Sequence, residues 1–134
     1  MGVEQLTERT AGTAKILFVE DEFLVRQLVR VTLERAGYEV FEAEDIRTAK
    51  RIIEAEHPAP LILDIKLPGS NGWDLVTVIK ADPAHVDAKI IMVTGSHADS
   101  DRLRAQEFMV DAYLAKPFSP WELIHTVRQV LGSS

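Results

Sequence analysis

Cysteine is absent from this chain of 134 residues. Without thiols the protein forms no disulfide and offers no thiolate to a metal, which agrees with a cytoplasmic location. The sequence also lacks an apolar run long enough to cross a bilayer, so we expect no membrane insertion. Residues 1–14 are polar, contain no apolar core of a secretory signal, and are expected to form a flexible N-terminal tail.

A surplus of positive charge is missing as well. Lys and Arg number 15 against 21 Asp and Glu, and the formal net charge is −6. The basic residues are scattered among acids instead of forming a patch, which argues against direct binding of nucleic acid. Hydrophobic residues make up 46% of the chain, enough for one domain with a sizeable core, expected at residues 15–134.

Short apolar runs alternate along the chain with segments of helical periodicity. We expect strands at residues 15–19, 39–43, 61–64, 89–93 and 112–115. We expect helices at about residues 22–35, 46–55, 72–82, 99–108 and 120–132. Five βα repeats with continuously hydrophobic strands predict a parallel sheet that is covered on both faces.

The handedness of βα crossovers limits how these repeats can be arranged. Right-handed connections make a doubly wound (βα)5 sheet of order 2-1-3-4-5, the flavodoxin-like α/β fold, the simplest topology. In this order the first and third strands are neighbours. Glu20 and Asp21, after strand one, should therefore lie beside Asp64, which ends strand three.

Polar residues of different kinds follow the other strands too. Thr94 comes after the fourth strand and Lys116 after the fifth. The carboxyl ends of parallel strands share one edge of the sheet, where α/β proteins bind ligands. The sequence therefore predicts one site made of Asp64, the acid pair, Thr94 and Lys116.

The chemistry of this set is specific. Three neighbouring carboxylates repel one another unless a cation joins them, and hard oxygen ligands suit Mg²⁺. Asp64 could be both metal ligand and nucleophile, because a carboxylate that attacks phosphorus forms an aspartyl phosphate. Lys116 and the metal would offset the charge of the transferring phosphoryl group, and the Thr94 hydroxyl could donate to one of its oxygens.

With these residues in this order, the chain resembles the receiver domains of two-component response regulators, in particular the single-domain chemotaxis type. The resemblance covers roughly residues 15–131. It rests on Glu20-Asp21, the segment Asp64-Ile65-Lys66-Leu67-Pro68 with Gly72, Thr94-Gly95, and Lys116-Pro117-Phe118.

The resemblance implies a phosphorylation-activated signalling switch in a two-component system or phosphorelay. Asp64 would accept a phosphoryl group from a phosphohistidine of a histidine kinase or a histidine phosphotransfer protein. Mg²⁺ would be bound by Asp21, Asp64 and the backbone carbonyl of Lys66, while Glu20 would support the metal through water. Lys116 would pair with the phosphoryl group. The protein would assist its own phosphorylation and dephosphorylation without being an enzyme for a separate substrate.

A conformational output is also implied. Thr94 would move towards the phosphoryl group and Tyr113 would turn inward, although a half-buried core aromatic is an equally good interpretation of Tyr113. This change would remodel the face of helix four, strand five and the last helix, which would control a downstream protein. Homodimerisation on phosphorylation is a further expectation. The chain stops three residues after Leu131, so we expect no output domain, and the Lys116-Pro117 bond is expected to be cis.

Three positions depart from the family pattern. Gly95 stands where Ala is more common, which leaves extra room beside Asp64. Met109 replaces a common Gly after helix four, so we expect that helix to lack its left-handed stop. Lys66 adds a positive side chain at the rim, near the path of an attacking water.

Other functions remain open at this point. A small Mg²⁺-dependent phosphohydrolase with an aspartyl-phosphate intermediate needs a second acid two residues after the nucleophile, where this chain has Lys66. A docking module that ignores phosphorylation would not need the acids, Thr94 and Lys116. Flavin binding fits the topology, but Glu20-Asp21 would repel a phosphate after strand one.

Overall fold

The central sheet has the predicted topology. The structure is a computed structural model that describes residues 14–67, 69–85, 87–95 and 106–132. Five strands form the sheet: β1 (Lys15–Val19), β2 (Glu39–Ala43), β3 (Leu61–Asp64), β6 (Ile90–Thr94) and β7 (Ala112–Ala115). Their order is β2-β1-β3-β6-β7 and every pair is parallel, which confirms the doubly wound, flavodoxin-like prediction.

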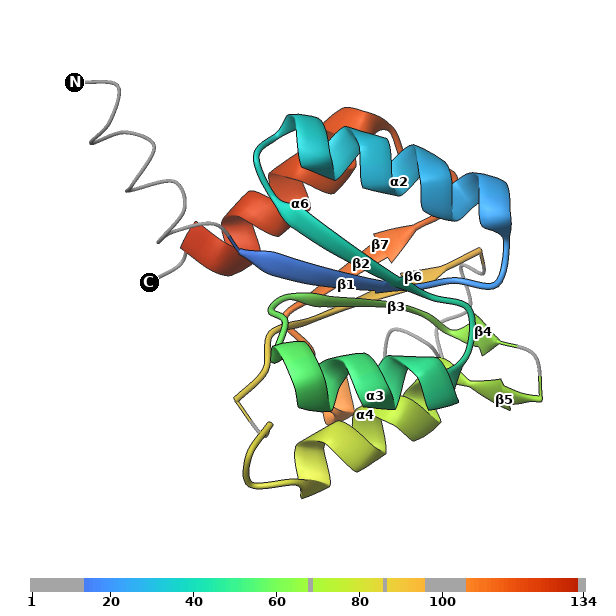
Figure 1. Ribbon diagram of the computed structural model, residues 1–134, viewed down its shortest axis with the longest axis vertical. Coiled ribbons are helices and arrows are strands. Elements are labelled where there is room, and N and C mark those ends of the chain that lie inside the picture. Colours follow the sequence, from blue (N-terminus) through green and yellow to red (C-terminus); the bar gives the residue numbers. More distant parts are fainter. Residues whose placement is uncertain (1–13, 68, 86, 96–105, 133–134) are drawn as a thin grey trace.

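Helices cover both faces of this sheet. They are α2 (Phe23–Arg35), α3 (Ile46–Glu56), α4 (Gly72–Ala81) and α6 (Pro120–Gly132). Figure 1 shows α2 and α6 on one face of the sheet and α3 and α4 on the other. The helix expected at 99–108 falls mainly outside the described residues, which include only its helical residues 106–107. The expected N-terminal tail lies outside them too, except for Ala14. None of the helices described is both long and apolar enough to span a bilayer.

Two separate cores explain why the central strands β1, β3 and β6 show no alternation of polar and apolar residues. In β1, Leu17 and Val19 pack into the core on the side of α3 and α4, whereas Ile16 and Phe18 pack into the core on the side of α2 and α6. All four side chains are fully buried. Successive residues of a strand point to opposite faces, so a sheet covered on both sides requires a continuous apolar run.

The segment between β3 and α4 is more ordered than the predicted turn. Two short antiparallel strands, β4 (Lys66–Leu67) and β5 (Ser70–Asn71), form a small hairpin there. Helix α4 then begins with a capping box, in which the side chains of Asn71 and Asp74 each accept from the other residue's backbone N–H.

The expectation that Met109 removes the left-handed stop is wrong. Met109 itself adopts that conformation, with φ of 55°, and its N–H donates to the Gln106 carbonyl at 3.1 Å. A side chain in this region costs roughly 1–2 kcal/mol. The turn must nevertheless close, because Asp111 holds the chain to β6: its N–H donates to the Ile90 carbonyl and its carboxylate accepts from the Ile90 N–H.

Helix α2 carries two apolar stripes, of which the fold buries one. Val29 and Leu33 are buried against the sheet. The other stripe is exposed to 79% at Leu24, 61% at Leu28 and 46% at Val31. Helical periodicity identifies both stripes but does not say which of them the domain itself covers.

Candidate functional site

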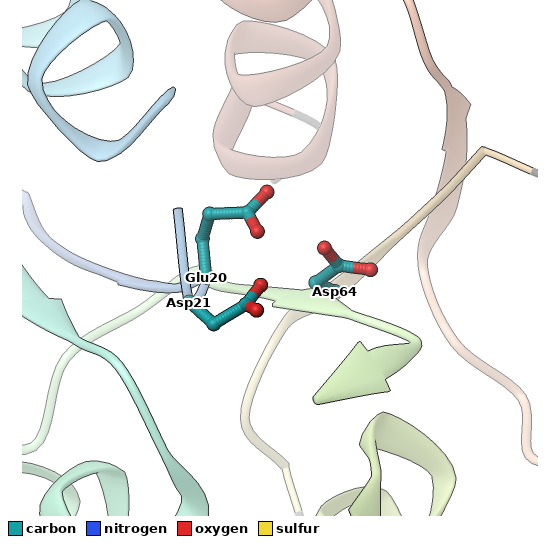
Figure 2. A group of neighbouring side chains, drawn as sticks. All are labelled: Glu20, Asp21 and Asp64. Atoms are coloured by element: carbon teal, nitrogen blue, oxygen red, sulfur yellow. The ribbon is translucent and has the colours of Figure 1, made fainter. Parts of the chain in front are cut away.

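The three predicted acids meet at one edge of the sheet. Glu20 and Asp21 directly follow β1, and Asp64 is the last residue of the neighbouring strand β3. One carboxylate oxygen from each lies within 4.8 Å of the others. Figure 2 shows the three carboxylates directed towards a common space. The adjacency expected from the strand order is therefore present.

Lys116 reaches this cluster from the far side. Its ammonium donates to the Glu20 carboxylate and, at 2.9 Å, to Oδ2 of Asp64. The Lys116 backbone N–H donates to the Thr94 carbonyl at 2.7 Å, and the Lys116-Pro117 bond is cis, as expected. Two acids from different strands are thus joined by one cation at the end of β7.

Burial makes the electrostatics of Glu20 unusual. Its side chain is fully buried, and this desolvation raises its pKa to about 7, with the Asp64 charge adding to the shift. The hydrogen bond from Lys116 lowers the pKa of Glu20 but only partly offsets the effect of desolvation. Burial tends to lower the pKa of Lys116, but its bonds to Glu20 and Asp64 outweigh this and raise it. One ammonium among three carboxylates leaves negative charge for a further cation to neutralise.

The donor set fits Mg²⁺. All three side chains offer hard oxygen ligands, and Asp21 is exposed, so a bound ion would keep access to water on that side. Two oxygens bound to one Mg²⁺ lie at most about 4.2 Å apart, given bond lengths of about 2.1 Å. The carboxylates would therefore close in by a few tenths of an ångström, or one of them would act through water.

The main chain fixes the Asp64 carboxylate. Its Oδ1 accepts from the Lys66 N–H at 3.0 Å, and the following Ile65 N–H donates to the Val93 carbonyl. Gly72 lies against the same peptide: a Cβ at this position would lie 2.4 Å from the Asp64 carbonyl oxygen. Only glycine leaves room for Asp64 in its observed position.

Gly72→Ala is therefore expected to displace Asp64. We expect a loss of about 1–3 kcal/mol in the free energy of unfolding and, if Asp64 accepts a phosphoryl group as the family resemblance implies, slower labelling of the remaining folded protein. Chemical denaturation and phosphoryl labelling would measure the two effects. Gly95→Ala is the matched control near the same site, because a Cβ there meets no atom within 4 Å. Equal free energies of unfolding and equal labelling rates in the two variants would contradict the steric argument.

Comparison with known proteins now adds to this geometry. The sequence model described as "Response regulator receiver domain" matches residues 16–128. The chain belongs to this family. The prediction of a receiver domain of a two-component response regulator is thereby confirmed.

Proteins of similar sequence agree with this assignment. The chain is 40% identical over 116 residues to the phosphate regulon transcriptional regulatory protein PhoB of Pseudomonas aeruginosa, covering 87% of this chain and 51% of that protein. The receiver thus spans about half the length of the curated relatives it matches.

Solved structures also resemble this receiver. The chemotaxis protein CheY4 of Vibrio cholerae has a TM-score of 0.84 at 29% identity, covering 89% of this chain and 99% of that one. A CheY-like response regulator receiver domain protein of Methanospirillum hungatei has a TM-score of 0.82 at 30% identity, with coverages of 91% and 96%.

The two predicted switch residues lie in different parts of the receiver: Thr94 ends the strand beside Asp64, and Tyr113 lies on the edge strand of the sheet. Thr94 is buried at the end of β6, one residue after Val93, the register partner of Asp64. Tyr113 is half-buried on the edge strand β7, where it lines a groove of about 460 Å³ with Met109. The switch roles of Thr94 and Tyr113, and metal binding by the Lys66 carbonyl, remain predictions.

The sequence interpretation missed two residues of this neighbourhood. The Arg26 guanidinium donates to the backbone carbonyls of Glu20 and Asp21, and it also bonds Glu42 on β2. An Arg one turn inside the helix that follows the acid pair is a weak signal. Its partner Glu42 is 16 residues away and is identified only by the packing of α2 on β2.

Proposed function

We propose that this receiver is a phosphorylation-activated switch in which Asp64 accepts a phosphoryl group from phosphohistidine in the presence of Mg²⁺. The observation that carries the proposal is the Lys116 ammonium bonded to Glu20 and Asp64 beside the accessible carboxylate of Asp21. This arrangement supports the proposal, because carboxylates that could act as nucleophile and metal ligands lie with one cation at the same edge of the sheet.

Each side chain has a distinct role in the proposed transfer. A carboxylate oxygen of Asp64 attacks phosphorus, the P–N bond of phosphohistidine breaks, and the imidazole leaves with the electron pair and takes a proton from solvent. Bound Mg²⁺ would supply positive charge against the phosphoryl oxygens. Lys116 exchanges its bond to Asp64 for one to the phosphoryl group, and the Thr94 hydroxyl donates to another oxygen.

Labelling with acetyl phosphate tests this function directly. In Mg²⁺ we expect one phosphoryl group per chain, located by mass spectrometry on the peptide that contains Asp64. Hydroxylamine should cleave this acyl phosphate, leaving a hydroxamate on Asp64 and releasing inorganic phosphate. Chelation of Mg²⁺ should prevent labelling. Absence of label with both acetyl phosphate and phosphorylated histidine kinases would exclude the proposed function.

The alternatives predict different results. A phosphohydrolase would turn over small phosphomonoesters steadily, but the residue two positions after Asp64 is the exposed Lys66, not an acid. A docking module would bind its partner equally well with and without the phosphoryl group. The bonding of Lys116 to both buried acids favours the switch over a docking module, and Lys66 in place of an acid favours it over a phosphohydrolase.

We propose that the phosphoryl donor docks on the exposed stripe of α2. Leu24, Leu28 and Val31 lie on the helix that begins directly after the acid pair. Leu28 also lines an apolar cavity of about 470 Å³ that extends to Lys116. A protein that brings phosphohistidine to Asp64 can therefore bury apolar surface beside the point of transfer.

Leu28→Lys is expected to slow phosphotransfer from a histidine kinase or phosphotransfer protein by about 10–100-fold, because it places a charge in the docking surface. Labelling by acetyl phosphate, which needs no docking surface, should stay within about twofold of wild type. Val78→Lys is the control, since Val78 is 45% exposed on α4, on the opposite face of the sheet. Equal slowing by both substitutions would contradict the assignment of α2.

We further propose that output is a protein contact on the face that includes β7 and α6. Exposed apolar side chains on this side include Met109 and Trp121, each 77% exposed. Relatives named as transcriptional regulators extend beyond the receiver, which is compatible with control of another domain or protein. Direct DNA binding by residues 15–134 is not proposed, and dimerisation on phosphorylation remains a prediction.

A further inference from the structure

The backbone that carries the acid pair is held by one guanidinium. Arg26 lies in the second turn of α2 with its side chain only 12% exposed. Its Nη1 donates to the Glu20 carbonyl at 2.8 Å and to the Asp21 carbonyl at 3.1 Å. Its Nε donates to Glu42 at 3.2 Å. A single planar group thus joins the loop that carries the acid pair (residues 20–22) to strand β2.

The cap of α2 adds little to hold this loop. The Glu22 side chain makes no capping hydrogen bond, unlike those of Asp45 and Asn71, which cap α3 and α4 by accepting from backbone N–H groups. The Glu22 N–H instead donates to the Glu20 carboxylate at 3.4 Å. On the other side of the loop, the Glu20 N–H donates to the Ala43 carbonyl at 2.9 Å. Strand β2 therefore holds Glu20 in two ways. It binds the Glu20 N–H directly, and it binds the Glu20 carbonyl through Arg26.

We propose that Arg26, oriented by Glu42, is a positioning residue that sets the Mg²⁺ affinity of the acid pair. The inference rests on the proposed function, since it concerns the same metal site. Rotation of the peptides after Glu20 and Asp21 would redirect both carboxylates, and the guanidinium opposes that rotation by bonding both carbonyls. Groups that orient metal ligands commonly change affinity by about 10–100-fold when they are replaced.

Arg30 provides an internal comparison. It lies one turn further along α2 and also pairs with Glu42, through the other carboxylate oxygen. Its remaining bond goes to Glu34, four residues later on the same helix. Arg30 therefore shares the ion pair of Arg26 but, within the described part of the chain, makes no hydrogen bond to the acid pair.

The test compares Arg26→Lys with Arg30→Lys in the full chain. Lysine keeps the charge but lacks the fork that reaches two carbonyls and Glu42 together. By titration calorimetry we expect Arg26→Lys to weaken Mg²⁺ binding about tenfold or more. Arg30→Lys should stay within about twofold of wild type. Chemical denaturation of the metal-free variants separates loss of affinity from loss of stability.

Glu42→Gln provides a second route in case Arg26→Lys folds poorly. Glu42→Gln keeps the Arg26 guanidinium but weakens its bond to residue 42, so we expect a smaller loss of Mg²⁺ affinity than for Arg26→Lys. In the double variant Arg26→Lys/Glu42→Gln, the loss of affinity should be less than the sum of the two single losses. Equal affinities of Arg26→Lys and Arg30→Lys would overturn the positioning role while leaving the proposed function intact. Failure of the wild-type chain to bind Mg²⁺ would instead overturn the proposed function, and this inference with it.

Discussion

Asp64→Asn is expected to abolish phosphorylation by acetyl phosphate and by any phosphohistidine donor. The amide of Asn is a poor nucleophile and cannot form an acyl phosphate, so we expect the labelling rate to fall on the order of 10⁴-fold or more. Asn also loses the negative charge that pairs with Lys116 at 2.9 Å. Its size is nearly unchanged, so the fold should remain intact.

The measurement is time-resolved phosphoryl incorporation, with circular dichroism to verify folding. Asp87→Asn serves as the control, because Asp87 is an exposed acid on the surface and the substitution makes the same chemical change. Labelling of Asp64→Asn at the wild-type rate would assign the phosphoryl group to another residue. It would leave the acid cluster without its proposed nucleophile.

Glu20→Gln is expected to alter the pH dependence of stability more than any surface substitution. Desolvation raises the pKa of Glu20 from 4.5 to about 7 in the folded protein. Between these two values the folded state binds more protons than the unfolded state, so the free energy of unfolding falls as pH rises. Protonated Glu20 contributes its full stabilisation below pH 4.5, and this contribution is lost as pH rises through about 7.

Gln imitates the protonated form at every pH. In Mg²⁺-free buffer we therefore expect Glu20→Gln to be more stable than wild type by about 2–3 kcal/mol at pH 8, with the difference narrowing at pH 5. Urea denaturation across this range would measure it. Asp21, Asp64 and Lys116 surround Glu20 and are unchanged in the comparison.

Two controls isolate the buried charge. Glu54→Gln removes one exposed carboxylate on α3 and should change stability by no more than about 0.5 kcal/mol. Added Mg²⁺ should stabilise wild type at pH 8 more than Glu20→Gln, because binding to the folded state is stronger when the carboxylate is charged. Parallel pH profiles for wild type and Glu20→Gln would refute the argument from burial.

Much of this fold could be predicted from local patterns. Short, mainly apolar runs placed β1, β3 and β7 at their observed bounds, and β6 within one residue. Pro120 and Gly132 likewise marked the observed ends of α6. These predictions succeed because strand burial, helix initiation and chain reversal depend on residues that are close in sequence.

Contacts between distant segments were not predictable in the same way. The sequence contained Arg26 and Glu42, but their hydrogen bond depends on how α2 lies on β2. It contained Gly72, but the approach of the Asp64 carbonyl appears only once β3 and α4 pack together. Local rules about Met109 gave the wrong answer, because Asp111 holds the chain in a turn that Met tolerates at a cost.

Local sequence patterns were enough to predict the order of elements, the parallel sheet and the set of polar residues at the strand ends. Right-handed crossovers then allowed one economical arrangement, in which Asp64 had to adjoin the acid pair. Packing of distant segments was needed to establish the burial that raises the pKa of Glu20, the bonds from Lys116 to both acids, and the exposure of one α2 stripe. Solvation and side-chain contacts depend on every segment packed around a group, whereas periodicity and turn chemistry depend only on its neighbours along the chain.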